Sequence, residues 1–289
     1  MEKENKNNDA GGEIKNRSEI LFLYDAKDCD PNGDPFTGEP RFDEETQKVM
    51  VSDVRLKRYI RDYIDLYESD ENNDKIENKD KSKVVFYSSL GKTETIGGRR
   101  GSLKNIVVNK VDWKDLLKKC IDIRLFGCVL AEESANIDLT GTVQFKNMNR
   151  SLNKVILKPL QNTSVIKSKE KNEQGAIATT TQVPYALISA IGYINAKTAE
   201  FNKTTEEDIK MLLMALWNQV NTINTRSKVE QTSRLILKIN YIDALSKISD
   251  IESLIGLKED KKDEINYRTF SEIEKDLDFS KMLEVLEKK

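Results

Sequence analysis

The sequence predicts an α+β fold in which two amphipathic helices lie on one face of a sheet. Residues 20–24 read ILFLY, a nearly continuous apolar run that is typical of a strand buried on both faces. Residues 52–67 and 204–223 repeat apolar side chains at helical spacing, and residues 232–242, TSRLILKINYI, alternate apolar and polar side chains as a strand does.

Composition limits the classes of function. The 289 residues include 38% hydrophobic residues, enough for a sizeable core, but no histidine, the commonest general base and zinc ligand. No apolar run approaches the roughly 18 to 20 residues of a membrane span, and the N-terminus is polar, so we expect a cytoplasmic protein. Cys29, Cys120 and Cys128 form no CxxC pair, which predicts buried thiols and no metal or other cofactor.

The net charge of −2 hides an uneven distribution along the chain. Residues 243–289 carry a net charge of −4 and residues 65–80 one of −5, which leaves +7 on the remainder. A basic remainder of this kind favours contact with nucleic acid.

The first part of the chain predicts a tail, a strand, a loop and a helix. Residues 1–18 are polar and are expected to be disordered. The loop from Asp25 to Val51 is longer than ordinary connections, which indicates a functional or disordered segment. Ser52 is a suitable N-cap for the helix that follows. Basic residues flank the apolar stripe of this helix: Arg55, Lys57, Arg58 and Arg61.

The middle of the chain is interpreted as an inserted subdomain. Residues 83–90, KVVFYSSL, predict a short strand, and residues 112–119 predict a helix that leads into an apolar stretch at 123–131. Since this part has no strong strand pattern of its own, we expect a helical insertion.

The second half predicts further strands from Asp138 onward. Strand-like stretches on both sides of a polar, basic tip predict a protruding hairpin at about 160–182. With the helix at 204–223 and the strand at 232–242, the order becomes strand, helix, strands, helix, strand. This order fits a ferredoxin-like or RRM-like βαββαβ sheet with insertions, whose second face or rim we expect to be free for RNA. Residues 243–289 contain short amphipathic helices.

The acidic loop offers two metal hypotheses. Five residues match the keyed positions of an EF-hand calcium loop: Asp28, Asp30, Asn32, Gly33 and Glu39. A preceding strand and two prolines, Pro31 and Pro35, contradict that context. The second hypothesis is a magnesium site for phosphodiester cleavage, with four carboxylates as ligands: Asp25, Asp28, Asp30 and Asp34. A solvated, turn-rich loop accounts for both patterns, and we favour that interpretation.

Several other loops combine basic side chains with Gly, Asn or Gln. They are GGRRGS at 97–102, QFKNMNRSLNK at 144–154, the tip with Lys167, Lys169 and Lys171, and TRSK at 225–228. Such loops suit contacts with a phosphate backbone and 2′-hydroxyls better than a small-molecule pocket. The sequence has no Walker loop, GxGxxG or RNP motif, so base-specific recognition is not indicated.

Six collinear stretches between residues 19 and 242 resemble one protein family. They are LFLYDAKDCDPNGDP, VSDVRLKRYIRDYI, IRLFG, LTGTVQFKNMNRSLNKV, VPYALISAIGYIN and NTRSKVEQTSRLILKINY, with a weaker match near the C-terminus. In these stretches the chain resembles the backbone subunit of the type I CRISPR Cascade complex, the seventh Cas protein family, type I-B subfamily.

The resemblance implies a right-hand shape. The palm is expected to be RRM-like and to comprise residues 19–64 and 138–242, with a helical fingers insertion at 65–137 and a thumb hairpin at 160–182. Residues 1–18 remain a disordered tail and residues 243–289 a C-terminal helical segment.

The resemblance also implies a function and a set of partners. Copies of such subunits stack along CRISPR RNA in a helical filament, join other Cascade subunits and present the guide to target DNA. Guide contacts map onto seven residues: Arg55, Arg58, Gln144, Lys146, Arg150, Arg226 and Lys228. Type I backbone subunits are not thought to cleave, so no catalytic residue is expected. A metal-dependent endoribonuclease that uses the loop aspartates, as in related type III subunits, stays open as the alternative.

Overall fold

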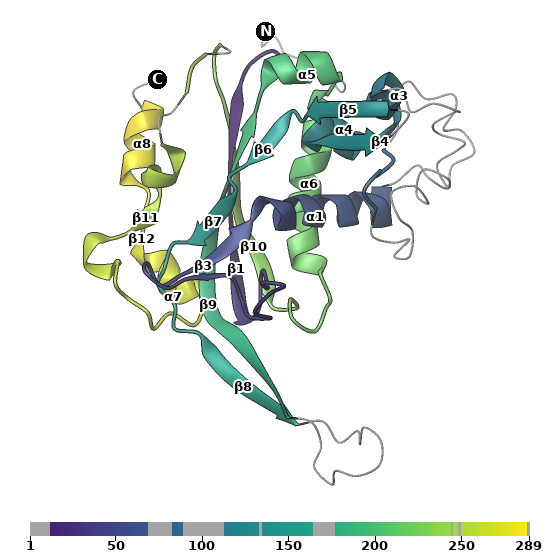
Figure 1. Ribbon diagram of the computed structural model, residues 1–289. Helices are drawn as coiled ribbons and strands as arrows, with labels where there is room; N and C mark the ends of the chain where they lie inside the picture. Colours follow the sequence, from purple (N-terminus) through teal and green to yellow (C-terminus); the bar gives the residue numbers. More distant parts are fainter. Residues whose placement is uncertain are drawn as a thin grey trace, which may run out of the picture.

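The computed structural model describes residues 12–68, 83–88, 113–132, 135–163, 177–243, 245–247 and 250–287. Its centre is an antiparallel sheet with the strand order β10-β1-β9-β7-β3-β2, in which β6 and β8 also pair with β9. The strands are β1 (Ser18–Cys29), β2 (Phe42–Asp43), β3 (Lys48–Ser52), β6 (Val143–Phe145), β7 (Met148–Ser151), β8 (Lys158–Thr163), β9 (Ile177–Ile194) and β10 (Gln231–Asn240). Because helices pack on this sheet (Figure 1), the predicted α+β class is confirmed.

Strand β1 lies between β9 and β10 and is buried on both faces, as its apolar run predicts. Residues 20–24 are at most 1% exposed and divide alternately between two apolar clusters, one on each face. The strand continues to Cys29, and β3 begins at Lys48, so the predicted loop from Asp25 to Val51 is wrong at both ends. The reason is that Asp25 and Ala26 are paired with β9 and β10, which satisfies their backbone groups within the sheet.

Two helices, α1 (Asp53–Tyr63) and α6 (Glu206–Thr222), cover one face of the sheet, as predicted. Helix α1 ends in a π-helical turn, Ile64–Glu68. The predicted N-cap Ser52 is confirmed, since its hydroxyl accepts the third N–H of α1. Thr205 forms a capping box at the start of α6. A short helix, α5 (Ala196–Asn202), precedes α6 and was not predicted.

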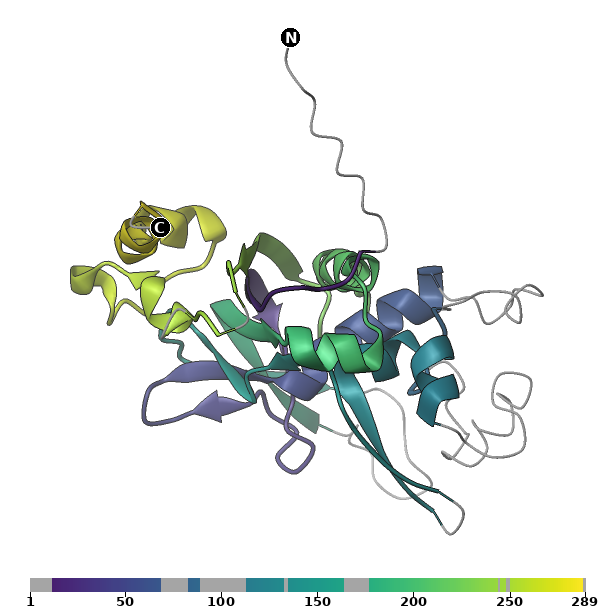
Figure 2. The same cartoon turned by 90° about the horizontal axis from the view of Figure 1, so that it is seen from above.

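The second face of the sheet is covered by the C-terminal segment, so the expectation of a free face is wrong. Figure 2 shows this segment and the helices on opposite sides of the sheet. Apolar side chains of β1, β9 and β10 pack there against Tyr241, Ile251, Leu257, Ile273 and Met282. A strand that is apolar on both faces requires a cover on both, and the short amphipathic elements after β10 provide the second.

The C-terminal segment consists of short elements, as predicted. They are a 3-10 turn (Ile251–Leu254), β11 (Gly256–Leu257), a 3-10 turn (Glu259–Lys261), α7 (Phe270–Ile273), a 3-10 turn (Glu274–Asp276), β12 (Leu277–Asp278) and α8 (Ser280–Glu287). Strands β11 and β12 pair with each other.

The insertion between α1 and β6 has its own apolar cluster and is only partly helical. It contains α3 (Trp113–Lys119), α4 (Ile121–Phe126), β4 (Gly127–Glu132) and β5 (Ala135–Thr140). The helix predicted at 112–119 is confirmed. The hairpin of β4 and β5 was missed, and the strand predicted at 83–90 is reduced to one bridge between Val84 and Cys120 within residues 83–88. Gly127 enables the change from α4 to β4, because it has φ +77° and a Cβ there would lie 2.0 Å from the Leu139 carbonyl oxygen.

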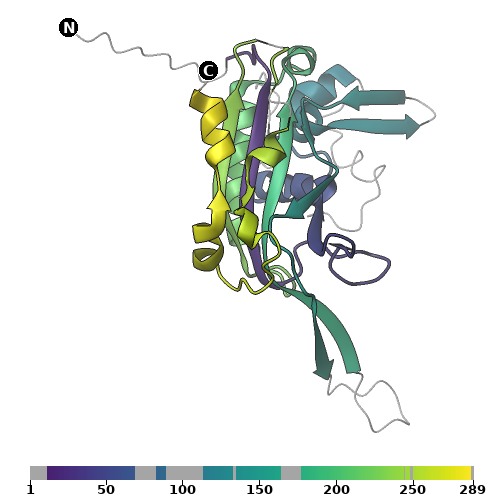
Figure 3. The same cartoon turned by 90° about the vertical axis from the view of Figure 1, so that its left-hand side faces the viewer.

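The predicted hairpin at 160–182 protrudes from the sheet, as Figures 1 and 3 show. It pairs β8 with the first part of β9, from Lys158 opposite Gln182 to Thr163 opposite Ile177. Because β9 continues into the centre of the main sheet, the hairpin is an extension of that sheet. The tip, with Lys167, Lys169 and Lys171, lies outside the described residues, as does the basic loop at 97–102.

The prediction of a disordered tail at residues 1–18 is wrong for its last part. Residues 1–11 lie outside the described residues, but Ile14 is buried in the cluster beneath the helices, and Glu13 pairs with Thr205. These contacts hold residues 13 and 14 against the fold. The prediction of buried thiols is confirmed for Cys29, Cys120 and Cys128. No helix among the described residues is long and apolar enough to cross a membrane.

Arg124 of α4 joins the insertion to α6. Its guanidinium is 1% exposed and contacts both oxygens of Asp208, with Nε to Oδ2 at 3.1 Å and Nη2 to Oδ1 at 2.8 Å. It also donates to the carbonyls of Leu117 and Lys118, while Asp208 accepts the Thr205 N–H in the capping box. This buried pair therefore fixes α3 and α4 to the start of α6.

We predict that Arg124→Met destabilises the protein by about 3 to 5 kcal/mol, because Asp208 would remain buried without its partner. Urea denaturation measures the loss. The exposed pair of Lys197 and Glu200 provides the control, since Lys197→Ala should change stability by less than about 1 kcal/mol. An Arg124→Met variant as stable as that control would show that the pair does not join the two parts.

We also predict that the thiols of the folded protein react slowly at pH 8. Burial raises the pKa of Cys29 to about 12 and that of Cys128 to about 11, so almost no thiolate is present. Labelling with a disulfide reagent before and after denaturation measures this, and fast labelling of native Cys29 or Cys128 would contradict it.

The same shifts make the free energy of unfolding depend on pH. Because the folded pKa values are raised, the contribution of each thiol is full below the unfolded pKa near 8.5. Between that value and the folded pKa, the free energy of unfolding falls by about 1.4 kcal/mol per pH unit per thiol.

Candidate nucleic-acid interface

Four arginines line a groove of about 700 Å³ at the start of α1. We call it the arginine groove and define it by its lining residues: Asn32, Arg41, Ser52, Asp53, Val54, Arg55, Arg58, Arg61, Tyr87, Asn147 and Met148. Its one acidic side chain, Asp53, forms an ion pair with Lys57 at 2.8 Å. The lining of the groove is therefore basic, although Arg41, Arg58 and Arg61 each also pair with a carboxylate outside it.

Four segments that are distant in sequence build the groove, and hydrogen bonds join three of them at the start of α1. The Asn32 side-chain oxygen accepts the N–H and the hydroxyl of Ser52 at 2.8 and 2.9 Å, which ties the acidic loop to the N-cap of α1. The Asn147 carbonyl accepts the Asp53 N–H at 3.0 Å, which ties the turn between β6 and β7 to the same helix end. The walls of the groove are thus held by hydrogen bonds and do not depend on a ligand.

Helix α1 supplies three of the arginines at intervals of three residues, so they lie along one side of the helix. Arg58 is exposed and forms an ion pair with Asp62 at 2.6 Å. Arg61 pairs with Asp122 at 3.1 Å and lies over the rings of Tyr87 and Phe126. The cations are thereby positioned before any anion arrives.

Arg55 is held more firmly than its neighbours on α1. Its guanidinium lies 4.2 Å from the centre of the Tyr59 ring, and its Nε is buried without a hydrogen-bond partner. Arg41 comes from the loop before β2, pairs with Asp34 at 3.3 Å and likewise has a buried Nε without a partner. The ring of Tyr59 and the carboxylate of Asp34 thus hold these two guanidiniums in place.

Arg41 and Arg61 were missing from the predicted contact residues. Arg61 was recognisable because it follows Arg58 by three residues on a predicted helix. The loop sequence around Arg41 gave no signal of where its side chain points.

Lys228 and Arg226 lie in the turn between α6 and β10. The Lys228 ammonium donates to the Asp30 carbonyl at 2.9 Å and lies 3.9 Å from its carboxylate. Burial raises the pKa of Asp30 and lowers that of Lys228, while the charge of nearby Arg55 opposes the first shift and adds to the second. Lys228 and Arg55 thus belong to one charged cluster, and Arg226 is exposed beside it.

The other three predicted residues lie on the opposite side of the sheet. Val143 and Phe145 of β6 face the helices, so Gln144 and Lys146 face the C-terminal segment. Gln144 is exposed, and Lys146 forms an ion pair with Glu252. The structure therefore does not unite the seven predicted residues in one surface.

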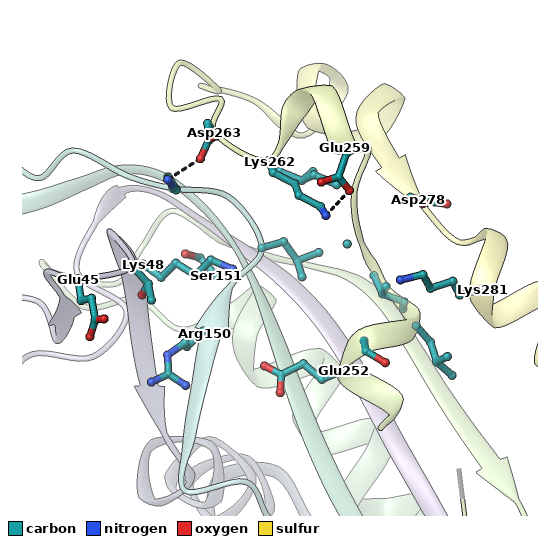
Figure 4. Close-up of a pocket in the computed structure, with 18 residues that line it drawn as sticks. Glu45, Lys48, Arg150, Ser151, Glu252, Glu259, Lys262, Asp263, Asp278 and Lys281 are labelled. Atoms are coloured by element: carbon teal, nitrogen blue, oxygen red, sulfur yellow. Dashed lines mark hydrogen bonds and ion pairs between the residues drawn. The ribbon is translucent and has the colours of Figure 1, made fainter. Parts of the chain in front are cut away.

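Arg150 of β7 lines a separate cavity of about 670 Å³ between the sheet and the C-terminal segment, shown in Figure 4. It lies 3.4 Å from the Asp43 carboxylate. Five basic residues line this cavity together with five acidic ones: Lys48, Arg150, Lys154, Lys262, Lys281, Glu45, Glu252, Glu259, Asp263 and Asp278. The acidic and basic side chains of this cavity balance, so the cavity suits a phosphate less well than the arginine groove does. Burial also lowers the pKa of Lys48.

The aspartates of the acidic loop have different partners. Asp25 accepts hydrogen bonds from Tyr185 and Arg234 on the side of the C-terminal segment, whereas Asp34 pairs with Arg41 at the groove. Asp28 has a left-handed backbone with φ +46°. Among the residues that the structure describes, no group of three or more acidic or cysteine side chains is arranged to hold a metal ion.

Comparison with known proteins gives one family. The chain is 29% identical to the CRISPR-associated protein Cas7 of Haloferax volcanii, over 94% of this chain and 83% of that protein. Two solved chains described as CRISPR RNA-guided surveillance complexes, one of them pre-nicking, resemble it with TM-scores of 0.45 and 0.48. They are 15% and 14% identical, cover 76% of this chain in each case, and are themselves covered to 68% and 75%. The family model for CRISPR-associated protein Cas7 matches residues 16–278, so the chain belongs to the Cas7 family.

Proposed function

We propose that this protein is a non-catalytic, CRISPR RNA-binding backbone subunit of a type I Cascade complex, of the type I-B subfamily. Copies of it would line the spacer of the guide in the cytoplasm, join other Cascade subunits and present the guide to target DNA. The observation that carries the proposal is the arginine groove in a chain of the Cas7 family. Arginine forks bind phosphate oxygens in pairs, and phosphate contacts hold a strand in register without reading its bases.

The arrangement of the elements supports an RRM-like palm. The order β10-β1-β9-β7, with α1 and α6 on one face, is that of a ferredoxin-like βαββαβ sheet. We assign residues 19–64 and 138–242 to this palm and residues 65–137 to the fingers, whose separate apolar cluster supports the division. The β5 strand extends to Thr140, which favours a boundary slightly later than residue 138. The hairpin at 160–182 is the proposed thumb.

The guide follows the groove side of the palm in this proposal. Arg41, Arg55, Arg58 and Arg61 hold phosphates, and Lys228 with Arg226 extends the track from Arg55. Contacts by Gln144, Lys146 and Arg150 belong to the other side of the sheet. Lys146 and Arg150 reach a guide only if they exchange Glu252 and Asp43 for phosphate.

The proposal of a non-catalytic role rests on how the loop carboxylates are used. Asp25, Asp30 and Asp34 each have a basic partner in a different part of the fold. A carboxylate that neutralises a neighbouring cation is a weaker ligand for magnesium than one that points into a shared site.

We predict that Arg55→Ala/Arg58→Ala weakens RNA binding by at least tenfold, to a similar extent for unrelated spacer sequences. Because each phosphate contact to a single strand contributes about 0.7 to the slope of log K against log salt, the slope should become shallower by about 1.4. Fluorescence anisotropy between 50 and 300 mM salt measures both. The control Lys197→Ala/Lys210→Ala removes the same charge from α5 and α6 and should leave the slope nearly unchanged. A changed spacer preference with an unchanged slope would refute the assignment to phosphates.

We predict that the protein assembled on CRISPR RNA leaves complementary RNA intact in the presence of magnesium. Gel analysis of end-labelled RNA measures this. Periodic cleavage that disappears in Asp34→Asn or Asp30→Asn would instead establish the endoribonuclease. The protein as purified should show excess absorbance at 260 nm and sediment as an oligomer. A protein without RNA that stays monomeric when offered CRISPR RNA would contradict the backbone role.

A further inference from the structure

Phe36 is the most exposed large apolar side chain among the described residues, with 97% of its surface accessible. It lies at the apex of the loop between β1 and β2, which we call the aromatic loop and define as residues 32–41. An aromatic side chain offers about 150 to 250 Å² of surface for burial by a partner. One exposed ring is ordinary by itself, so the inference depends on where the loop holds Phe36.

The aromatic loop is held by its own hydrogen bonds. The Arg41 N–H donates to the Asn32 carbonyl at 2.9 Å, and the Asp34 N–H donates to the Glu39 carbonyl at 2.7 Å. Gly38 has φ +72°, which allows the turn, and its N–H donates to the Asp34 carbonyl at 2.8 Å. The ring is therefore presented by a closed, defined turn, which lowers the entropy cost of using it in binding.

One carboxylate connects Phe36 to the arginine groove. Asp34 Oδ1 accepts the Phe36 N–H at 2.9 Å, and its Oδ2 accepts the Arg41 guanidinium at 3.3 Å. Asn32 and Arg41, the two ends of the aromatic loop, both line the groove. Glu39 accepts a hydrogen bond from Thr181 at the base of the protruding hairpin. Figure 3 shows the loop projecting on the same side of the sheet as the hairpin of β4 and β5.

We propose that Phe36 stacks on an unpaired nucleobase of a single-stranded RNA whose phosphates lie in the arginine groove. The inference rests on the proposed RNA-binding function and adds a contact to bases. An aromatic ring beside a cationic track is the usual arrangement for single-stranded nucleic acid, since backbone and base then bind to adjacent surfaces. All four bases have a flat π-face, so this contact adds affinity without adding sequence preference.

The charge around the ring favours RNA over a second copy of the chain. Cations line the groove into which the ends of the loop lead, and the loop's own carboxylates on Asp34 and Glu39 are occupied by Arg41 and Thr181. A second copy of the chain would need an apolar pocket to bind Phe36. The apolar rim of that pocket would then lie against the cations of the groove, which is unfavourable.

The experiment compares a uridine oligonucleotide with an abasic oligonucleotide of the same length and backbone. For the wild-type protein we expect tighter binding of the uridine strand. Phe36→Ala should weaken uridine binding on the order of tenfold and leave abasic binding unchanged, whereas Phe36→Trp should retain the preference. Arg58→Ala should weaken both to the same extent. Phe201→Ala removes an aromatic ring that stacks on Trp113 and does not line the groove, so as a control it should change neither.

The outcomes separate the two proposals. If the wild type binds both strands and Phe36→Ala binds them as the wild type does, stacking is refuted and RNA binding stands. If the wild type binds neither strand, both proposals fail. If Phe36→Ala lowers the sedimentation coefficient without RNA and preserves the preference for uridine, Phe36 contacts a second copy and the stacking proposal is refuted. Since the Phe36 side chain is 97% exposed, the urea midpoint of Phe36→Ala should equal that of the wild type.

Discussion

Burial of β1 on both faces is the constraint on which the rest of the structure depends. Its residues 20–24 bring apolar side chains to each side of the sheet, and each side must be covered. Helices α1 and α6 cover one face, and the C-terminal segment covers the other. The flat sheet surface on which many RRM domains bind RNA is therefore occupied here, and a ligand must use the edges and loops. The arginine groove lies at such an edge, where the first loop, the start of α1 and the turn before β7 meet.

Local sequence patterns predicted the helices and strands. Which surfaces of the sheet and helices remain exposed depends on packing between residues that are distant in sequence. The apolar run at 20–24 and the helical spacing in α1 and α6 depend on neighbouring residues, and these elements were predicted correctly. The cover over the second face depends on contacts between residues more than 200 positions apart, such as the hydrogen bond from Tyr241 to Glu19. The hairpin of β4 and β5 was missed because β4 reads GCVLAE and continues the apolar sequence of α4 without a polar break.

The candidate site was predictable only where its residues belong to a local sequence pattern. Arg55 and Arg58 were found because helical spacing places them beside the apolar stripe of α1. Arg41 was not found, because its position depends on the closed turn at 32–41 and on Asp34. In the sequence Lys146 is a basic residue in a polar loop, like the predicted phosphate contacts. Its ion-pair partner, Glu252, lies 106 residues away, so the sequence could not show that the charge of Lys146 is neutralised.

The distribution of these ion pairs explains why the two basic surfaces differ. The C-terminal segment, with its net charge of −4, places Glu252 on Lys146 and Asp263 on Lys154, so acidic residues neutralise that side of the sheet. Displacing them by phosphate would loosen the cover over an apolar face. Among the described residues Arg58, by contrast, pairs with Asp62 of its own helix, an exposed i,i+4 pair of the kind that contributes about 0.3 to 0.5 kcal/mol. An anion can replace that partner without disturbing the core, so the proposed phosphate contact at Arg58 costs the fold less than one at Lys146 or Lys154 would.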